Sequence, residues 1–514
     1  MNISRCAFFI ILACMAIQMQ ADDRDDVFAK KVTLSTGKGA IYQLLKEVSE
    51  QSGYSFVYDS EIIENDKKVS VRKGEYTLRN AIIAITGNKQ LQIDVLGNHI
   101  LLRLSNDKTD FSASNQQENN AAIILRGSIC DAETLEPIPY VNVSITGTTI
   151  GSVSNLNGEF QLTIHKPADT SKVRLSHVGY ETLETGISLL AGRQIDFFLK
   201  PQAISLQEVT VSAADPQQIL NDILKYKAQN YSLAPAYLTC FYREGIDLKQ
   251  RNIDLTEAVL QIYKSGSMDN SEHDQVKLIK KRRIANHQKN DTLMPRMKSG
   301  ISSCLVLDII KELPDFINPA NNALYTYSYN NITTVDGRLV NIVTFTQKPF
   351  VKEPLYTGDL YIEAENKALV EVRFEMNPRL VDKATYYFIA KKTRAINLSL
   401  QEAKYVVSYK PTTDGMYYIN HIRGDIVFKV RKRNQLFSSP LHFWFEMVTS
   451  KIVTEDVKPF QRNERLLPDN IFAETKHAYD QNFWDNFNLI LPEERLLETM
   501  INNLNEVIIS GELY

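Results

Sequence analysis

The residues that could do chemistry in this chain do not show the spacings that common enzyme sites use. None of the eight histidines is followed by glutamate three residues later, a spacing that would supply two zinc ligands from one turn of chain. The chain also contains neither a His-Glu-x-x-His motif nor a Gly-x-Ser-x-Gly nucleophile elbow. His165 and His177 lie in strand-like stretches, and we interpret them as surface or core residues. We therefore expect no catalytic, cofactor-binding or metal-binding residue and predict that the protein is not an enzyme.

The cysteines and carboxylates give no more specific signal. Cys6 and Cys14 lie at the extreme N-terminus, which leaves Cys130, Cys240 and Cys304. Because their number is odd and their spacing wide, we predict buried small apolar residues and no disulfide framework. Aspartate and glutamate together number 61, so a hydrolase that uses paired carboxylates stays an open alternative.

The first 21 residues have the features of a signal peptide. Arg5 precedes a short apolar run, Cys6–Ile17, and Ala21 is a plausible cleavage point. The run is shorter than a membrane-spanning helix requires, and no later run reaches about 18 apolar residues. We predict a protein exported to the periplasm and associated with the outer membrane. The stretch ending at Cys14 also resembles a lipobox, so lipidation of Cys14 is an alternative.

Length and composition indicate a multidomain, β-rich protein. The chain has 514 residues, enough for about three domains, with 24 Tyr and 22 Phe. Its net charge of −3 gives no reason to expect a nucleic-acid partner.

An internal repeat defines the first folded module. Residues 31–58 recur as residues 68–95 at a constant offset of 37. Each copy has an alternating stretch, a glycine, apolar residues at helical spacing and a second alternating stretch, which predicts strand, helix, strand. Residues 30–104 should therefore form a small α+β module built from two βαβ-type units.

This module resembles the secretin/TonB short N-terminal domain. The resemblance rests on Gln51–Asp59, on the second strand signal at Lys68–Val71 and on the spaced apolar residues of Leu78–Ile85. In that family the domain is a periplasmic interaction piece on secretins and on TonB-dependent receptors that signal to anti-sigma factors. The resemblance implies a periplasmic or outer-membrane partner protein, such as an anti-sigma factor or a TonB-system component.

Residues 105–121 are rich in Ser, Asn, Gln and Asp and are predicted to be a flexible linker. Residues 122–213 then show about seven short strand signals with frequent turns, which predict a β-sandwich. The turn at Asn155–Gly158 should need a positive φ at Gly158.

The sandwich resembles the carboxypeptidase regulatory-like domain, which is non-catalytic. The matching positions are Gly127, Asp131, Glu136-Pro137, Val141–Val143, Gly147-Thr148, Gly158–Phe160 and Gly179-Tyr180, with Asn155 where the family usually has Asp. Leu206–Val211 resembles the strand that follows this domain in TonB-dependent receptors of the Bacteroidetes type.

Residues 214–492 are predicted to form a mainly antiparallel, strongly curved β domain with few helices. A helix should start at Pro216, and hairpin signals occur at Asp336-Gly337, Asn366-Lys367 and Asp414-Gly415. Residues 493–514 are predicted to be a C-terminal helix and tail that either packs on the sheet or docks a partner.

This half resembles Bacteroidetes envelope proteins that carry the same sandwich. The similarity lies in Asn221–Tyr242 and in Tyr479–Asn488, while Tyr356–Asn377 is similar to the half-barrel of lipoprotein carriers. The basic clusters Lys280–Arg283 and Lys429–Arg433 are interpreted mainly as solvated faces or ends of strands, with contact to anionic lipid at the outer-membrane surface as the alternative. Trp444 and Trp484 are expected in the core or at a domain contact.

The sequence therefore favours a non-enzymatic envelope protein that acts as an interaction or signalling scaffold. The alternative is a lipid or lipoprotein carrier that uses the curved sheet.

Overall fold

The chain folds into two compact units, which are described here from a computed structural model. One unit contains residues up to 120 together with 192–197, and the other contains residues 121–191 and 198–514. The structure describes residues 27–59, 63, 67–96, 99–104, 122–165, 167, 170–187, 190, 194–202, 215–248, 251–266, 273–285, 296–297, 300–391, 396–432, 437–467, 472, 475, 487–493 and 496.

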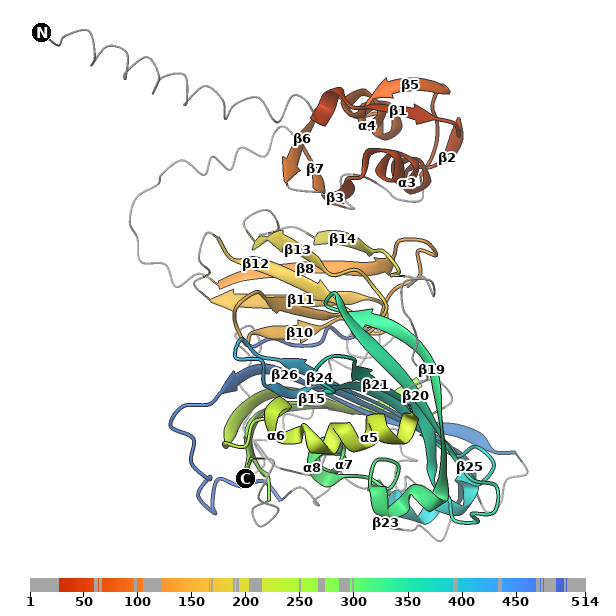
Figure 1. The fold of residues 1–514 in the computed structure, drawn as a ribbon, viewed down its shortest axis with the longest axis vertical. Coiled ribbons are helices and arrows are strands. Elements are labelled where there is room, and N and C mark those ends of the chain that lie inside the picture. Colours follow the sequence, from red (N-terminus) through yellow and green to blue (C-terminus); the bar gives the residue numbers. More distant parts are fainter. Residues whose placement is uncertain are drawn as a thin grey trace, which may run out of the picture. The chain divides into compact units, whose positions relative to one another are not determined.

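The first unit contains the predicted repeat, and strands of one copy pair with strands of the other (Figure 1). The first strand of each copy pairs with the second strand of the other, so that β1 pairs with β5 and β2 with β4. The two helices start 37 residues apart, at Ile41 and Leu78, and bury the predicted apolar faces. The elements are β1 (Lys31–Leu34), β2 (Lys38–Ala40), α3 (Ile41–Ser52), β3 (Ser55–Asp59), β4 (Lys68–Ser70), β5 (Gly74–Thr77), α4 (Leu78–Thr86), β6 (Leu91–Leu96) and β7 (His99–Leu104).

The second unit begins with the predicted sandwich. One sheet has the strand order β10-β9-β12-β13, and β11 pairs with β8 in the facing sheet. The apolar side chains that alternate along these strands, such as Val143, Leu162 and Leu175, are fully buried. The elements are β8 (Ala122–Asp131), β9 (Asn142–Ile145), β10 (Gly151–Val153), β11 (Glu159–His165), β12 (Lys172–Ser176), β13 (Leu183–Gly186) and β14 (Gln194–Leu199), of which β14 contributes residues to both units.

The turn before β11 has the conformation predicted for it. Gly158 has a φ of 74°, in the region that residues with a Cβ avoid. A Cβ at this position would also lie 2.3 Å from the carbonyl oxygen of Ile129. Glycine is therefore required here both for its φ and for the close approach of β8.

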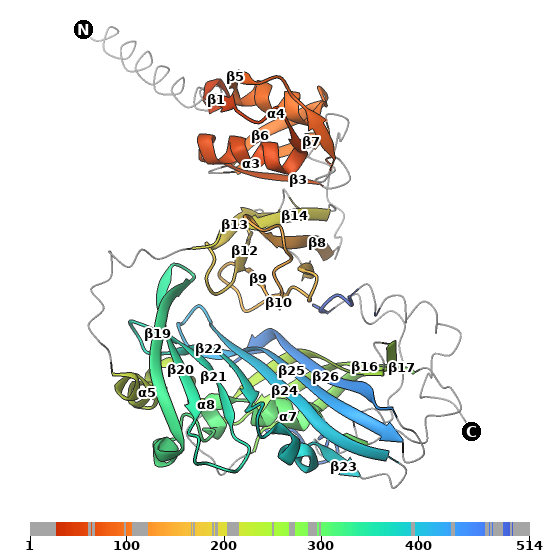
Figure 2. The same cartoon turned by 90° about the vertical axis from the view of Figure 1, so that its right-hand side faces the viewer.

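The rest of the second unit is built on one ten-stranded antiparallel sheet. Its strand order is β17-β16-β15-β26-β25-β24-β22-β21-β20-β19, and the sheet is visibly curved (Figure 2). Its strands are β15 (Ala236–Leu248), β16 (Arg251–Lys264), β17 (Gln275–Ala285), β19 (Tyr325–Val335), β20 (Arg338–Gln347), β21 (Tyr356–Glu363), β22 (Leu369–Met376), β24 (Ile396–Pro411), β25 (Tyr417–Lys432) and β26 (Ser439–Val453). The remaining elements are α5 (Pro216–Lys225), α6 (Lys227–Asn230), β18 (Arg296–Met297), α7 (Gly300–Val306), α8 (Ile309–Glu312), η4 (Pro319–Leu324), η5 (Val381–Tyr387) and β23 (Ile389–Lys391).

The three predicted hairpins join β19 to β20, β21 to β22 and β24 to β25. The predicted helix is α5, in which Pro216 is the first residue and the Asp215 side chain accepts the Gln217 N–H at 3.0 Å. The sequence reasoning missed α7 and α8, and it did not identify β17 as a full strand.

Helices cover one face of the large sheet, which we call the helix-covered face (Figures 1 and 2). The buried side chains of α5, α7 and α8 belong to the same apolar cluster as those of this face. Aromatic rings form its centre, with Phe316 stacked on Phe345 at 4.4 Å and Phe374 stacked on Tyr405 at 5.1 Å between ring centroids. Among the described residues, this face therefore forms the main core of the second unit.

The sandwich covers the opposite face, which we call the sandwich-covered face. Val153 of β10 is packed with Phe241, Val259 and Val448 of the sheet in a separate apolar cluster. The Asp336 hairpin also reaches the sandwich, because the Gly179 N–H donates to the Thr334 carbonyl at 2.8 Å. These contacts explain why the sandwich and the large sheet form one unit rather than two independent modules.

Several predictions fall outside the described residues. They concern the signal peptide at residues 1–21, Cys14, the linker at 105–121, Leu206–Val211, Trp484 and nearly all of residues 493–514. Among the residues that are described, no helix has the length and apolar character needed to cross a membrane.

Candidate functional site

A row of alternating charges crosses five strands on the sandwich-covered face. Arg423 of β25, Glu446 of β26, Arg243 of β15, Glu257 of β16 and Arg282 of β17 stand directly opposite one another in register. We call these five residues the charge ladder. Directly opposed residues in an antiparallel sheet have neighbouring side chains, so each charge lies beside one of opposite sign.

The centre of the charge ladder is fully buried. Arg243 donates to Glu446 at 2.9 Å, and both side chains are 0% exposed. Arg423 lies 3.7 Å from the same carboxylate on the other side, and Arg282 pairs with Glu257. Charges removed from water to this degree require partners, because the cost of an unpaired buried charge is several kcal/mol.

Trp444 lies close to two of the three arginines of the charge ladder. The guanidinium carbons of Arg423 and Arg243 are 4.7 Å and 5.4 Å from its ring centroid, within the range of cation–π attraction. Gly245 faces Trp444 across the strand pair, and a Cβ there would lie 2.5 Å from the indole ring. The missing side chain of Gly245 therefore makes room for the ring.

Residues 488–493 pass between the sandwich and the charge ladder. Arg243 donates to the Leu491 carbonyl at 3.2 Å and to Glu493 at 2.9 Å. From the sandwich, Asn155 donates to the same Leu491 carbonyl at 3.2 Å, and the Thr163 N–H donates to the Asn488 side chain at 2.6 Å. Asn488 is the last residue of the Tyr479–Asn488 segment identified in the sequence, and it contacts the sandwich, whereas Leu491 and Glu493 contact the large sheet.

The electrostatics of the charge ladder favour its ionised form. Burial alone would raise the pKa of Glu446, but Arg243, His421 and Arg423 more than offset this effect and lower the pKa to about 2. Burial likewise opposes the charge on His442, but the hydrogen bonds that the imidazole donates to Asp247 and Asp425 raise its pKa.

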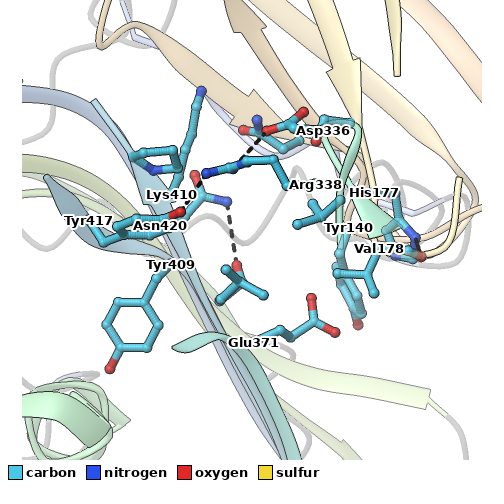
Figure 3. Close-up of a pocket in the computed structure, with 16 residues that line it drawn as sticks. Tyr140, His177, Val178, Asp336, Arg338, Glu371, Tyr409, Lys410, Tyr417 and Asn420 are labelled. Atoms are coloured by element: carbon cyan, nitrogen blue, oxygen red, sulfur yellow. Dashed lines mark hydrogen bonds and ion pairs between the residues drawn. The ribbon is translucent and has the colours of Figure 1, made fainter. Parts of the chain in front are cut away.

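A polar cleft lies beside the charge ladder, where the Asp336 hairpin and the ends of β22, β24 and β25 meet the sandwich (Figure 3). It has a volume of ≈ 50 Å³, enough for a few water molecules or one small polar group. The lining residues are Tyr140, Asn142, Ser176, His177, Val178, Val335, Asp336, Arg338, Val370, Glu371, Ser408, Tyr409, Lys410, Pro411, Tyr417 and Asn420.

Most charged groups of the cleft have partners. Arg338 pairs with Glu363 at 2.8 Å and donates to the Tyr417 hydroxyl at 2.5 Å. Glu371 pairs with Arg373. Burial lowers the pKa of His177, and Glu371 only partly opposes this effect, so the imidazole is neutral near pH 7.

A second cavity of ≈ 50 Å³ lies on the helix-covered face and contains lysines. Lys264 pairs with Asp308 at 2.6 Å, and Lys311 pairs with Asp274 at 2.5 Å. Tyr409 donates to Asp308 at 3.0 Å. The polar side chains of this cavity therefore satisfy one another, which indicates a structural role.

The basic cluster Lys280–Arg283 is only partly what the sequence indicated. It does lie on the edge strand β17, but it is not mainly a solvated face, because Lys281 is 4% exposed and donates to the Phe472 carbonyl at 2.8 Å. Arg282 pairs with Glu257, and Arg283 pairs with Asp254 at 2.5 Å. Acidic residues on the neighbouring strand β16 thus pair with two of the four basic residues of the cluster.

The structure places the other candidate residues in positions that do not indicate a catalytic or metal-binding role. Cys240 and Cys304 are buried, as predicted, and Cys130 is half-buried. His165 is exposed at the end of β11, whereas His177 lines the cleft. Trp444 is buried at the contact between the sheet and the sandwich side, as expected. Among the described residues, no group of three His, Cys, Asp or Glu side chains could hold a metal ion.

Among the described residues, Glu244 is a buried carboxylate with a raised pKa. Burial raises the pKa of Glu244 to about 7, and Tyr242 donates to this carboxyl at 2.6 Å. Glu244 lies on the helix-covered face, whereas Glu446 lies on the sandwich-covered face. Glu244 lines neither of the two cavities described above.

Comparison with known proteins gives one family assignment within the chain. Residues 125–211 match the model of the carboxypeptidase regulatory-like domain, as predicted for the sandwich. No family model assigns residues 30–104 to the secretin/TonB short N-terminal domain. No curated protein matches the chain.

Solved structures show only distant likeness. A domain assigned to outer-membrane lipoprotein sorting from Vibrio parahaemolyticus is 11% identical, with a TM-score of 0.22, over 48% of this chain and 96% of its own. A DUF1329 family protein from Desulfovibrio piger is 11% identical, with a TM-score of 0.19, over the same shares. A membrane-associated protein of unknown function from Bacteroides fragilis is 9% identical, with a TM-score of 0.13, over 64% of this chain and 98% of its own. At these TM-scores the likeness assigns neither fold nor activity to this chain.

Proposed function

We propose that the protein is a non-enzymatic interaction or signalling scaffold of the cell envelope, located in the periplasm and associated with the outer membrane. The proposal rests on the observation that both faces of the large sheet are covered by other parts of the unit. Helices pack on one face, while the sandwich and residues 488–493 pack on the other through the charge ladder. The central residues of the charge ladder, Arg243 and Glu446, are engaged in holding the β structures together.

The sequence of the first module supports an envelope partner. Its resemblance to the secretin/TonB short N-terminal domain favours a periplasmic or outer-membrane protein, such as an anti-sigma factor or a TonB-system component. The regulatory-like sandwich agrees with this assignment, because this kind of domain is a non-catalytic extension in receptors.

The large sheet offers a physical means of docking at β19. This 11-residue strand ends the strand order of the sheet, so no further strand of the sheet pairs with its outer edge. Thr326, Ser328 and Asn330 are exposed along it, and the strand contains no charged residue or proline to discourage pairing. An extended segment of a partner could add to this edge by main-chain hydrogen bonds.

Photo-crosslinking from β19 tests the scaffold role. A photoreactive residue at Ser328 in the mature protein should form an adduct with one identified periplasmic or outer-membrane protein, and an excess of unlabelled mature protein should suppress it. The same group at Asp414, an exposed turn residue between β24 and β25, serves as the matched control and should give no such adduct. The absence of a saturable adduct at Ser328 would argue against docking at this edge. Turnover of a peptide, sugar or ester that a single point change abolishes would contradict the non-enzymatic assignment.

The carrier alternative would require the helix-covered face to open. In the described residues this face packs against α5, α7 and α8, so an acyl chain could enter only after these helices move. Mass spectrometry of gently purified protein distinguishes the two functions, because a co-purified lipid would favour the carrier.

A further inference from the structure

Two polar groups in the cleft of Figure 3 have no hydrogen-bond partner among the described residues. Lys410 is half-buried near the end of β24, and among the described residues no hydrogen bond or ion pair reaches its ammonium group. Asn142 of β9 has a buried side-chain oxygen without a hydrogen-bond partner in the described chain. The charged ammonium group of Lys410 and the unpaired side-chain oxygen of Asn142 therefore line the same small cleft.

The neighbouring charges do not neutralise Lys410 by direct contact. Asp336 is nearby but pairs with Arg174 at 3.0 Å, while Arg338 and Glu371 have the partners described above. Burial lowers the pKa of Lys410 to about 8, although Asp336 partly opposes this effect. The ammonium group thus stays mostly charged at pH 7 and lacks a counter-ion of its own.

The surroundings also define the charge of a suitable ligand. Asp336 and Glu371 both line the cleft, so a dianion such as phosphate would meet two carboxylates and only one uncommitted ammonium. A monoanion would meet less repulsion. The unpaired oxygen of Asn142 requires a hydrogen-bond donor. A carboxylate alone carries no donor, but a ligand with an amide N–H next to its carboxylate does.

We propose that this cleft binds the carboxylate end of a peptide chain. Lys410 donates to the carboxylate, and Asn142 accepts the N–H of the terminal residue. The volume of ≈ 50 Å³ suits this small group alone, with the remainder of the peptide lying outside. The inference stands apart from docking at β19, since it concerns a different surface of the same unit.

Calorimetric titration of the purified mature protein tests the proposal with N-acetylglycine, which combines a carboxylate with an adjacent N–H. We expect saturable binding at millimolar concentrations, weaker binding of acetate and no binding of N-acetylglycinamide. Lys410→Met should weaken binding of N-acetylglycine about ten- to hundredfold, the range for loss of a hydrogen bond to a charged group. Asn142→Ala should weaken the binding of N-acetylglycine but leave the binding of acetate unchanged. Lys352→Met, at an exposed lysine elsewhere on the unit, is the matched control and should bind like the unaltered protein.

A pH series on the unaltered protein gives a readout that does not depend on any variant folding. Affinity for N-acetylglycine should fall as the pH rises through about 8, because Lys410 then loses its proton, while His177 is already neutral in this range. Affinity that is constant between pH 7 and 9, equal binding by Lys410→Met, or tighter binding of inorganic phosphate than of N-acetylglycine would each overturn the proposal.

Discussion

Replacing Glu446 by glutamine should destabilise the second unit more than any surface change, because it removes the central negative charge of the charge ladder. Arg243 and Arg423 flank this carboxylate at 2.9 Å and 3.7 Å, and the side chain of Glu446 is 0% exposed. Glutamine preserves the shape but leaves two buried guanidinium groups facing a neutral amide. Breaking a buried pair by removing one partner costs about 3–5 kcal/mol.

The pKa of Glu446 gives a second route to the same magnitude. Its value falls from 4.5 to about 2 in the folded protein, and each pH unit corresponds to about 1.4 kcal/mol. The ionised carboxylate therefore contributes about 3 kcal/mol of folding free energy. Because the folded pKa is depressed, this contribution is present above pH 4.5 and is lost as the pH falls from 4.5 towards 2.

Urea unfolding followed by tryptophan fluorescence is a suitable assay, because Trp444 is one of only two tryptophans in the chain and contacts the arginines beside Glu446. We expect Glu446→Gln to lower the free energy of unfolding at pH 7 by about 3–5 kcal/mol. Glu402→Gln provides the matched control. That carboxylate pairs with Lys404 at the surface, where both side chains are about half exposed, and its loss should cost less than about 1 kcal/mol. A cost below about 1 kcal/mol for Glu446→Gln would refute the role assigned to the charge ladder.

Three further changes test individual features of the second unit. Gly158→Val should lower the melting temperature of the mature chain by several degrees, since it forces a Cβ onto a φ of 74° and to within 2.3 Å of the Ile129 oxygen; an unchanged melting curve would contradict it. Gly245→Ala should cost about 1–3 kcal/mol in urea unfolding, because the added methyl group meets the Trp444 ring at 2.5 Å. The raised pKa of His442 adds stability that is complete below pH 6.5 and is lost as the pH rises through that raised value. His442→Gln should therefore show a smaller fall in melting temperature between pH 6 and pH 8 than the unaltered protein, and equal slopes would exclude this contribution.

Local periodicity predicted the elements whose side chains follow one repeating pattern. The helices that start at Ile41 and Leu78, the helix capped by Asp215 and the three hairpins all lie where the sequence indicated. Before the Asp414-Gly415 turn the alternation predicts a strand only over Tyr405–Tyr409, which is shorter than β24, because Glu402 and Lys404 interrupt the apolar pattern. The structure shows a register shift next to Glu402 and both side chains exposed, so the strand continues through a bulge that simple alternation does not detect.

Long-range pairing explains what the sequence did not reveal about the candidate site. Arg243 and Glu446 are 203 positions apart. Glu446 lies between Phe445 and Met447 in β26, whereas Arg243 is followed directly by Glu244 in β15. The charge of Glu446 is the one local signal available, because a charge in an apolar strand must find a partner across the sheet. Lys410 and Asn142 lack even this signal, since the cleft exists only where the sandwich meets the large sheet.

The consecutive residues Tyr242, Arg243 and Glu244 show how one strand connects the two faces of the sheet. Tyr242 and Glu244 are buried on the helix-covered face, whereas Arg243 is buried in the charge ladder on the other. Burial raises the pKa of Glu244 to about 7, so its protonated form favours folding below pH 4.5, and that contribution is lost as the pH rises from 4.5 to about 7. The stability contributed by the ionised Glu446 is instead lost as the pH falls below 4.5. A pH series on Glu446→Gln should therefore show a smaller acid-side decline in stability than the unaltered protein, and the remaining decline comes from carboxylates such as Asp425 and Asp274, whose pKa values are also lowered. The decline towards pH 7 should persist, which separates the contribution of Glu446 from that of Glu244 in one measurement.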